Sequence, residues 1–589
     1  MPFKTKTLFQ VSIFLFGIIL FLPTWMVAQS RPNVILILTD DQGWGDLSLH
    51  NNPWVETPHL DSLAKRGKEF THFYVSPLCA PSRASILTGR HHLSTGVLSV
   101  SKGLEIMDPE ETTLAELFKA NGYRTGIFGK WHNGQHYPSR PNDQGFDEFL
   151  GFSAGHLSNY FNTNLEKNAA KVKTKGYITD VLTNAALQFI TDNKNKPFFC
   201  YIPYNAPHAP FQVPDRYFNK YKDKGLNNEL AAVYGMVDNI DENVGKILQY
   251  LKQNKLEENT IVLFLSDNGP NGHRFNDMMK GIKGSVHEGG VRAPFFISWK
   301  NHIQADQNID VPIANVDIYP TLSELCKLTS IPGKPIAGMS LVPLLLNNGV
   351  SFKANRNLYT HVNFMTVPVD LNAGGFRNSQ YRLVYENDKP QLYDLRRDPE
   401  EKTDLASVNS QLVNQFTDDY KKWFTAVSAN LMYNRPIVVS QKGVALPTYE
   451  ASLTAGIKFK EGHGWAHDWI ERWNTTTDSI SWEINCQDSG KYRVEIEYLC
   501  KKTDVGSRIV CRIGKESKPA TIKNAFYSAQ IPSPDRVPRK EAYEVSSWKR
   551  MEVGTYYIAS GKQLVTLRAL QVSNKNVAEI NSINLVPVD

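Results

Sequence analysis

Five apolar runs between residue 33 and about residue 300, separated by helical stretches, constrain the fold of this chain most strongly. The runs are VILILTD (34–40), YRTGIFGKW (123–131), PFFCYIPY (197–204), TIVLFLSD (260–267) and APFFISW (293–299). Such runs suit parallel strands that are covered on both faces. The segments between them, such as NELAAVYGMVDNIDENVGKILQYLKQ, have helical periodicity. We therefore predict an α/β fold in which helices sandwich a large, mixed, mostly parallel sheet.

Two further units follow this sheet. From about residue 300 to 430 the pattern is looser, and we predict a smaller C-terminal α+β subdomain that completes a region at 29–430. After a predicted linker at 431–445, apolar residues alternate with polar ones, as in Ile480, Trp482, Ile484 and Cys486. Alternation with period two indicates antiparallel strands. We predict an all-β sandwich at 446–589. Its stretch DSISWEINCQDSGKYRVEIEY resembles the strands of jelly-roll carbohydrate-binding modules, and a sandwich that packs on the preceding region and shapes its cleft is the equal alternative.

The first 28 residues have the pattern of an export signal. Lys4 and Lys6 precede an apolar stretch at 11–22, and Met26-Val27-Ala28 is an acceptable cleavage site. The apolar stretch is short for a membrane span, and no second stretch resembles one. We expect an exported protein, periplasmic or secreted, without stable membrane insertion; an uncleaved N-terminal anchor is the alternative.

Charge and cysteine content exclude two classes of protein. The net charge is +6 over 589 residues, and no dense Lys/Arg block is present, so a dedicated nucleic-acid binder is not expected. Six cysteines are too few for a scaffold built on disulfides. Cys486, Cys500 and Cys511 share the apolar phase of their strands, which leaves buried thiols or a Cys500–Cys511 bridge as the two interpretations.

Oxygen-bearing side chains end two of the predicted strands. Asp40 and Asp41 follow the first strand, and Asp267 and Asn268 follow another. Open α/β sheets bind ligands at the carboxyl ends of their strands, so these residues can converge. Three carboxylates and an amide oxygen suit a hard cation, Ca²⁺ or Mg²⁺. Taken singly, each pair is equally a turn or cap, because Asp and Asn favour such positions.

Basic residues follow the same strand ends. Lys130 and His132 lie in GKWH, His208 lies in PHAP, and Lys283 lies in a glycine-rich segment. One such residue alone is usually a surface or core residue. Together, beside a cation, they indicate a site that binds a tetrahedral anion and transfers protons to its leaving group.

A cysteine in the stretch SPLCAPSRASILTGR (76–90) raises a separate question. Cys79 could be half of a disulfide, a nucleophile or the precursor of another group. A cysteine nucleophile needs a nearby base or a helix N-terminus, and Pro81 is suited to the first turn of a helix. The spacing alone does not decide between these roles.

The stretch CAPSR followed by ILTGR resembles the signature of type I sulfatases. Six more segments resemble motifs of that family in the same order: NVILILTDDQGWGD, GYRTGIFGKWH, PHAP, LFLSDNG, GIKGSVHEGGVRAP and LYDLRRDPEEKTDLA. The resemblance spans about residues 31–430, and seven ordered motifs make it specific. It implies an alkaline-phosphatase-like fold and hydrolysis of sulfate esters. Asn133 departs from the leucine found in many relatives after GKWH.

The resemblance also implies a role for each motif residue. A maturation enzyme would convert Cys79 to Cα-formylglycine before export, and the hydrated aldehyde would attack sulfur with one hydroxyl and expel sulfate through the other. Arg83 and Lys130 would stabilise the hydrate, and His132 would act on its second hydroxyl. His208 would protonate the leaving alcohol, and Lys283 would bind sulfate oxygens and share in protonating the leaving group. The implied ligands of Ca²⁺, with Mg²⁺ as the alternative, are Asp40, Asp41, Cys79 in its modified form, Asp267 and Asn268.

We expect the substrate to be a sulfated carbohydrate. Algal galactans or ulvan come first, and host glycosaminoglycans or mucin glycans second, because an exported sulfatase with an added β-sandwich resembles those of polysaccharide-degrading bacteria. Candidate substrate residues are His156, His273, Arg274 and Arg377. A phosphodiesterase or phosphonate hydrolase of the same superfamily and a non-catalytic glycan-binding protein are the alternative functions.

Overall fold

The computed structural model describes residues 1–2, 31–346, 352–386, 388–538 and 544–588. The predicted export signal at 1–28 falls almost wholly outside the described residues. Within the described ranges, none of the helices combines the length and the apolar character that a membrane crossing requires.

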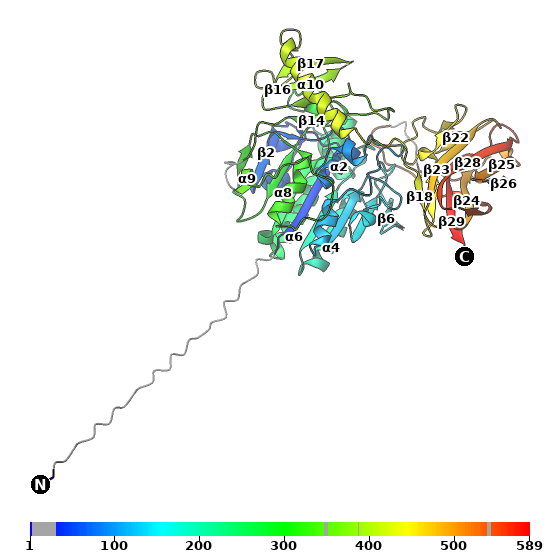
Figure 1. The fold of residues 1–589 in the computed structure, drawn as a ribbon, viewed down its shortest axis with the longest axis horizontal. Coiled ribbons are helices and arrows are strands. Elements are labelled where there is room, and N and C mark those ends of the chain that lie inside the picture. The colour runs from blue at the N-terminus through cyan, green and yellow to red at the C-terminus, as the bar shows by residue number, and fades with distance from the viewer. Residues whose placement is uncertain (3–30, 347–351, 387, 539–543, 589) are drawn as a thin grey trace.

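A ten-stranded mixed sheet forms the centre of the larger part of the molecule (Figure 1). Its order is β12 (Gln307–Ile309), β2 (Lys68–Phe70), β11 (Phe295–Ser298), β9 (Thr260–Ser266), β1 (Asn33–Thr39), β8 (Phe198–Pro203), β4 (Arg124–Lys130), β5 (Glu148–Phe152), β6 (Asn164–Lys167) and β7 (Ala170–Lys173). The central strands β9, β1, β8, β4 and β5 are all parallel. Their carboxyl ends therefore lie along one edge of the sheet.

Helices cover both faces of this sheet, as the apolar runs predict. One layer contains α2 (Cys79–Thr88), α3 (Leu114–Ala120), α8 (Ile318–Leu325) and α9 (Val342–Leu346). The other contains α1 (Pro58–Lys65), α4 (Ile178–Asn193) and α6 (Asn228–Gln253). Successive residues of β1 alternate between the two layers: Val34 and Leu36 pack in the first core, and Ile35 and Ile37 in the second. The predicted α/β fold class is confirmed.

The fifth apolar run differs from the prediction of a parallel strand. It forms the short β10 (Arg292–Ala293) and then β11, and β11 pairs with β9 in the antiparallel direction. Between β9 and β11 the only helix is α7 (Glu288–Val291), in this fully described stretch. A parallel pair needs a crossover, usually through a longer helix, so the chain returns antiparallel.

A small antiparallel sheet with one helix follows the main sheet. It consists of β14 (Leu358–His361), β15 (Gly374–Arg377), β16 (Tyr381–Glu386) and β17 (Lys389–Asp394), with α10 (Ser410–Val427) beside it (Figure 1). Phe376, Leu383 and Phe416 form part of the core between sheet and helix. This unit is the α+β subdomain expected after residue 300.

Two six-stranded sheets form the predicted all-β part (Figure 1). One contains β18 (Ile437–Val439), β20 (Ser452–Leu453), β23 (Ser479–Cys486), β25 (Arg508–Ile513), β26 (Glu516–Thr521) and β28 (Gly561–Gln571). The other contains β19 (Val444–Pro447), β21 (Lys458–Phe459), β22 (Ile470–Arg472), β24 (Gly490–Leu499), β27 (Lys549–Ile558) and β29 (Glu579–Val588). The inward-facing residues, including Trp473 and Trp482, form one core.

Two details of this β-sandwich differ from the expectations. The predicted linker at 431–445 is partly strand, because β18 pairs with β23 and satisfies its backbone there. All six cysteines are free thiols, so the Cys500–Cys511 bridge is absent. Cys511 lies opposite Lys518 and Leu567, whereas Cys500 pairs with Phe526, so the two cysteines are not cross-strand partners.

The β-sandwich contacts the larger part through a buried polar cluster. His136 Nε2 lies 2.9 Å from Glu450 Oε2, and Tyr449 donates a hydrogen bond of 2.9 Å to Gln135. Burial and the neighbouring Glu450 raise the pKa of Glu105 to about 7. Burial opposes the charging of His136, but the charge and hydrogen bond of Glu450 raise its pKa overall.

This cluster predicts a loss of stability as the pH rises from acidic to neutral. Both Glu105 and His136 hold their protons more tightly in the folded than in the unfolded state, so their contribution is complete below the unfolded pKa and is lost as pH rises through the folded pKa. For Glu105 this window runs from 4.5 to about 7. The shift corresponds to a loss of at most about 3 kcal/mol. Melting temperatures measured from about pH 5 to about pH 8 should fall more steeply for the wild type than for Glu105→Gln. Equal slopes would contradict the assignment.

Candidate active site

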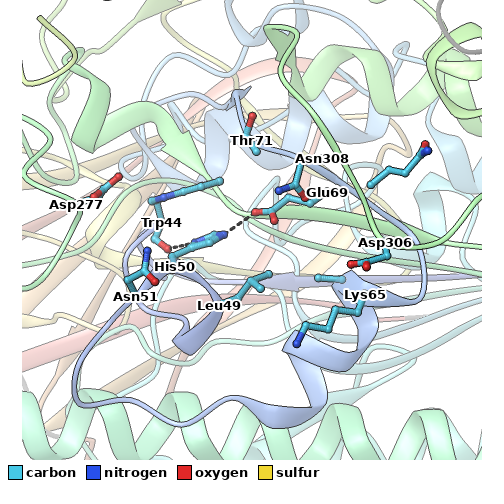
Figure 2. Close-up of a pocket in the computed structure, with 12 residues that line it drawn as sticks. Trp44, Leu49, His50, Asn51, Lys65, Glu69, Thr71, Asp277, Asp306 and Asn308 are labelled. Atoms are coloured by element: carbon cyan, nitrogen blue, oxygen red, sulfur yellow. Dashed lines mark hydrogen bonds and ion pairs between the residues drawn. The ribbon is translucent and has the colours of Figure 1, made fainter.

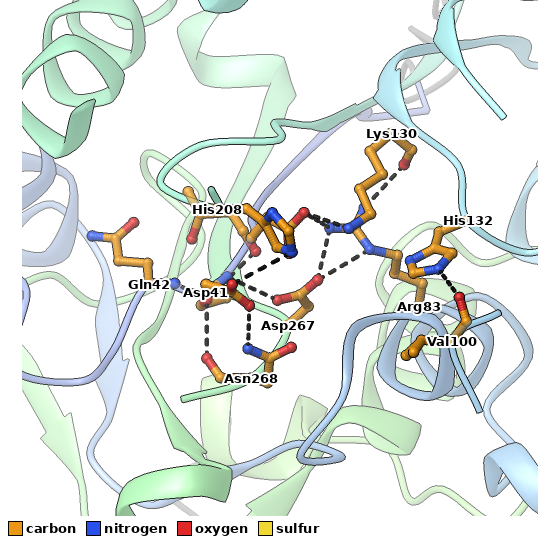
Figure 3. Close-up of polar contacts among 12 residues, drawn as sticks. Asp41, Gln42, Arg83, Val100, Lys130, His132, His208, Asp267 and Asn268 are labelled. Carbon is orange, nitrogen blue, oxygen red and sulfur yellow. Dashed lines mark hydrogen bonds and ion pairs between the residues drawn. The ribbon is translucent and has the colours of Figure 1, made fainter. Parts of the chain in front are cut away.

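The four predicted oxygen ligands meet where β1 and β9 end. These strands are parallel neighbours with Thr39 opposite Ser266, so the residues that follow them are brought side by side. Asp41 accepts a hydrogen bond of 2.8 Å from Asn268 Nδ2, and its own backbone N–H donates to Asp267 Oδ1 at 3.2 Å (Figure 3). Asp40, Asp41, Asp267 and Asn268 are all fully buried. The predicted convergence is therefore present.

Basic side chains from four other segments contact these carboxylates. Lys130 Nζ lies 2.6 Å from Asp40 Oδ2, and Lys283 Nζ lies 2.7 Å from Asp41 Oδ1. Burial alone would raise the pKa of Asp40, but Lys130, His208 and Arg83 together hold it far below its ordinary range. The pKa of Lys283 is raised by Asp41 against the opposing effect of burial. The site thus holds ionised groups of both signs away from water.

Cys79 is the first residue of α2 and points into this cluster. Its Sγ and carboxylate oxygens of Asp40 and Asp267 all lie within 4.8 Å of one another. The side chain is 3 % exposed, and burial raises the pKa of the thiol. A thiol with a raised pKa is mostly protonated at neutral pH and is a poor nucleophile. This environment favours the precursor interpretation of Cys79 over the working thiol.

Arg83 lies one helical turn after Cys79, on the same side of α2. Its guanidinium donates to Asp267 Oδ2 through Nε at 3.1 Å and through a terminal nitrogen at 2.7 Å, and the other terminal nitrogen donates to the Lys130 carbonyl at 2.9 Å. The side chain is fully buried. Arg83 therefore joins α2 to the ends of β9 and β4 (Figure 3).

The two histidines have different settings. His132 is 2 % exposed, its Nε2 donates to the Val100 carbonyl at 2.9 Å, and burial lowers its pKa so that the ring is neutral. His208 is partly exposed, and its Nε2 lies 3.7 Å from Asp41 Oδ2. Burial and Lys283 lower the pKa of His208, which makes its imidazolium a stronger acid.

The cluster has the donor set that a hard cation requires. Asp40 Oδ1 and Asn268 Oδ1 are buried and have no hydrogen-bond partner among the described residues. Buried polar atoms without a partner are rare in folded proteins. These two oxygens, with those of Asp41 and Asp267, form the all-oxygen set that Ca²⁺ prefers. The residues present therefore fit the ion.

The four candidate substrate residues separate into two pairs. Arg274 pairs with Asp46 at 2.7 Å and donates to the Asp41 carbonyl at 2.7 Å, so it supports the turn that carries the cluster. Arg377 is 4 % exposed, and its guanidinium lies over the ring of Tyr74 at 4.5 Å. Arg274 is thus committed to the turn, whereas Nε and one terminal nitrogen of Arg377 are buried without a hydrogen-bond partner among the described residues. The substrate role of both arginines stays a prediction.

The histidine candidates remain accessible to that role. His156 lies beside His208, with ring centroids 5.9 Å apart, whereas His273 is exposed on the surface.

Asp46 was not among the residues predicted for the site. Besides pairing with Arg274, it accepts a hydrogen bond of 2.8 Å from the backbone N–H of Gly43. Its position in the DDQGWGD segment, next to the predicted metal ligands, could have indicated that it belongs to the site.

A separate cleft of about 260 Å³ lies between the loop around residues 44–51, the segment from α1 to β2 and residues 306–308 (Figure 2). His50 stacks on Trp44 at 3.7 Å, and its two ring nitrogens contact the Trp44 carbonyl at 2.6 Å and Glu69 at 2.5 Å. None of the predicted catalytic or metal residues lines this cleft. Its histidine is committed to structural contacts.

Two family matches cover most of the region that builds this site. Residues 32–328 match the family described as Sulfatase, and residues 280–427 match the family described as N-sulphoglucosamine sulphohydrolase, C-terminal. The chain is 31 % identical over 486 residues to the uncharacterized sulfatase YdeN of Escherichia coli, covering 67 % of this chain and 86 % of YdeN. It is 34 % identical over 356 residues to N-acetylgalactosamine-6-sulfatase of Mus musculus, covering 54 % and 67 % of the two chains.

Solved structures show the same fold. The structure of Ps i-CgsB in complex with k-i-k-neocarrahexaose is 30 % identical, has a TM-score of 0.63, and covers 69 % of this chain and 95 % of its own. A phosphonate monoester hydrolase of Agrobacterium radiobacter shares the fold at 21 % identity, with a TM-score of 0.53 and coverage of 68 % and 96 %. The fold alone does not distinguish a sulfatase from a phosphonate hydrolase, but the family matches and the sequence relatives are sulfatases. The chain therefore belongs to the sulfatase family, and it is a sulfuric ester hydrolase.

Proposed function

We propose that this sulfatase removes sulfate from a sulfated carbohydrate, with formylglycine at position 79 and bound Ca²⁺. The observation that carries the proposal is the position of Cys79, buried within 4.8 Å of Asp40 and Asp267 and close to Arg83. Support for a carbohydrate comes from the relative Ps i-CgsB, whose structure contains k-i-k-neocarrahexaose. A sulfated galactan oligosaccharide is therefore the first substrate class to test.

Ca²⁺ and formylglycine would supply two functions that the unmodified side chains do not provide. Ca²⁺ would be held by Asp40, Asp41, Asp267 and Asn268 and would supply positive charge next to a sulfate oxygen. A formylglycine at position 79 would supply a hydrated aldehyde, in which one hydroxyl is the nucleophile and the other permits release of sulfate.

The side chains around them have proton-transfer and binding roles. Lys283 and Lys130 bring positive charge to the anionic sulfate, whose charge grows as the ester bond breaks. His208, next to Lys283 and partly exposed, donates a proton to the leaving alcohol. His132 is neutral because it is buried, so it can accept the proton whose removal expels sulfate. Arg83 holds α2, and with it residue 79, against β9.

Export and maturation complete the proposal. We expect residues 1–28 to direct export and a formylglycine-generating enzyme to act on the CAPSR segment before the chain folds. Burial of Cys79 supports this order, because a side chain that is 3 % exposed is out of reach of a modifying enzyme in the folded state.

The experiment that tests the function compares esters that share one alcohol. The Ca²⁺-loaded, matured enzyme should release sulfate from a sulfated galacto-oligosaccharide and act more slowly on the matching phosphate ester, because no further cation among the described residues of the site matches the extra negative charge of a phosphate. Exhaustive chelation should suppress sulfate release, and Ca²⁺ should restore it. A preference for the phosphate ester would favour the phosphodiesterase or phosphonate hydrolase alternative, and no turnover of any ester would favour a glycan-binding protein.

A further inference from the structure

One side of the loop that carries His208 is held by residues of the catalytic region. It runs from the end of β8 to α5 (Asp215–Lys222). The Tyr160 hydroxyl lies 3.1 Å from the His208 carbonyl and 2.8 Å from the Ala209 carbonyl. Gln212 is fully buried, and its Oε1 accepts from the backbone N–H of Tyr160 at 2.8 Å. Tyr160 and Gln212 thus hold the inner side of the loop.

The outer side of the same loop is held by the β-sandwich, through residues 532–536. The Nε2 of Gln212 donates to Asp535 Oδ1 at 2.7 Å. The Arg536 backbone N–H donates to the Phe211 carbonyl at 3.0 Å, and its guanidinium donates to the Val213 carbonyl at 3.0 Å. The guanidinium also lies over the ring of Phe218 at 4.6 Å. The segment therefore contacts three of the residues immediately after the PHAP motif.

A second segment of the β-sandwich contacts His156, whose ring lies beside that of His208. His467 Nε2 donates to the His156 carbonyl at 2.8 Å, and the His156 ring lies 5.9 Å from that of His208. The turn that presents His467 is fixed from within, because the buried Asp468 accepts from the backbone N–H groups of Gly464 at 3.0 Å and Trp469 at 2.9 Å. The contact is thus made by an ordered turn.

We infer that the β-sandwich is a working part of the active site, in which Asp535 and Arg536 are positioning residues that hold the His208 loop in its proton-donating geometry. The inference rests on the proposed role of His208 as the acid for the leaving alcohol. Proton transfer requires donor and acceptor within hydrogen-bond distance, and a displacement of about 1 Å can cost about 100-fold in rate. Loss of contacts on the outer side of the loop frees His208 for such a displacement.

The leaving group provides a readout that a general loss of folding does not produce. A sugar alkoxide is a poor leaving group and depends on protonation, whereas 4-nitrophenolate leaves without it. A misplaced His208 therefore slows hydrolysis of a sugar sulfate and spares hydrolysis of 4-nitrophenyl sulfate. A protein that is partly unfolded loses both activities in equal proportion.

The test compares both substrates in the full-length, matured enzyme. Asp535→Ala and Arg536→Ala should each lower kcat for the sulfated galacto-oligosaccharide by about 10-fold to 100-fold, with kcat for 4-nitrophenyl sulfate changed less than about threefold. His208→Gln should show the same selectivity with a larger effect. Glu450→Gln is the matched control, because it weakens a contact between the same two parts away from the loop and should leave both activities near wild type.

Two results would separate the failure of this inference from the failure of the proposed function. If His208→Gln is selective for the sugar ester and the Asp535 and Arg536 variants are not, the positioning role is wrong and His208 remains the acid. If His208→Gln lowers both activities equally, the acid role is wrong and the positioning role falls with it. Equal losses on both substrates in the Asp535 and Arg536 variants would also overturn the inference, since they would indicate a purely structural contact.

Discussion

Replacing Cys79 with alanine should abolish sulfate release while the protein stays folded. The substitution removes the precursor of the nucleophile, and removal of a covalent nucleophile costs on the order of 10⁶-fold in kcat. Stability should change little, because alanine is a good helix former and position 79 is the first residue of α2. Sulfate release on a sulfated oligosaccharide, with a thermal unfolding curve of the same sample, measures both effects.

A second cysteine provides the control for this variant. Cys326 is also buried and free, but it lies at the end of α8, and no predicted catalytic residue contacts it among the interactions that the structure describes. Cys326→Ala should keep wild-type sulfate release. Turnover by Cys79→Ala at more than a trace of the wild-type rate would show that another group attacks sulfur.

Replacing Arg83 with alanine should combine a large loss of stability with loss of activity. The guanidinium makes two hydrogen bonds to Asp267 Oδ2 and one to the Lys130 carbonyl, and none of these groups reaches water. Removing one partner of a buried ion pair leaves a charge uncompensated, which costs about 3–5 kcal/mol. Denaturant unfolding of the Ca²⁺-free protein measures this loss without a contribution from the ion.

Arg83→Lys is the matched variant for this prediction. Lysine keeps the positive charge near Asp267 but cannot make the forked contact or reach the Lys130 carbonyl in the same geometry. We expect a smaller loss of stability than in Arg83→Ala, with activity still strongly reduced. If Arg83→Ala unfolds at the wild-type denaturant concentration, the guanidinium does not join α2 to the sheet as described.

The sequence carried enough information to predict the sheet and the inner site. The apolar runs predicted β1, β4, β8 and β9, because a strand covered on both faces has to be apolar throughout. The polar residues that follow parallel strands must meet at one edge, so Asp40 and Asp267 could be placed together without a structure. The direction of β11 could not be read in this way, because an apolar run contains no information on its partner.

The contacts of Arg274 and Arg377 could not be predicted from the sequence for a different reason. Whether an arginine is free to bind a ligand depends on whether an acidic or aromatic partner lies beside it in the fold. The partner of Arg274 is Asp46, which lies 228 positions away in the chain. Arg377 packs on Tyr74, which lies in β3 (Phe73–Tyr74) of a separate three-stranded sheet, about 300 positions earlier in the chain. Sequence proximity to a motif therefore did not reveal these contacts.

The sequence left two interpretations of the β-sandwich open, a carbohydrate-binding module or a unit that packs on the catalytic region and shapes its cleft. Asp535 and Arg536 lie in a segment without strong periodicity, about 320 positions after the loop that they contact. The alternating strands predicted a sandwich, but they could not indicate which of its loops faces His208. The contacts between the two parts come only from their packing in three dimensions.

Formylglycine at position 79 is tested most directly by mass spectrometry of the peptide that contains this residue, from active enzyme produced with a maturation system. We expect that the residue has lost its thiol sulfur and carries an aldehyde oxygen, and that the rate of sulfate release rises in proportion to the modified fraction across preparations. Fully active enzyme in which residue 79 is entirely unmodified cysteine would contradict this expectation.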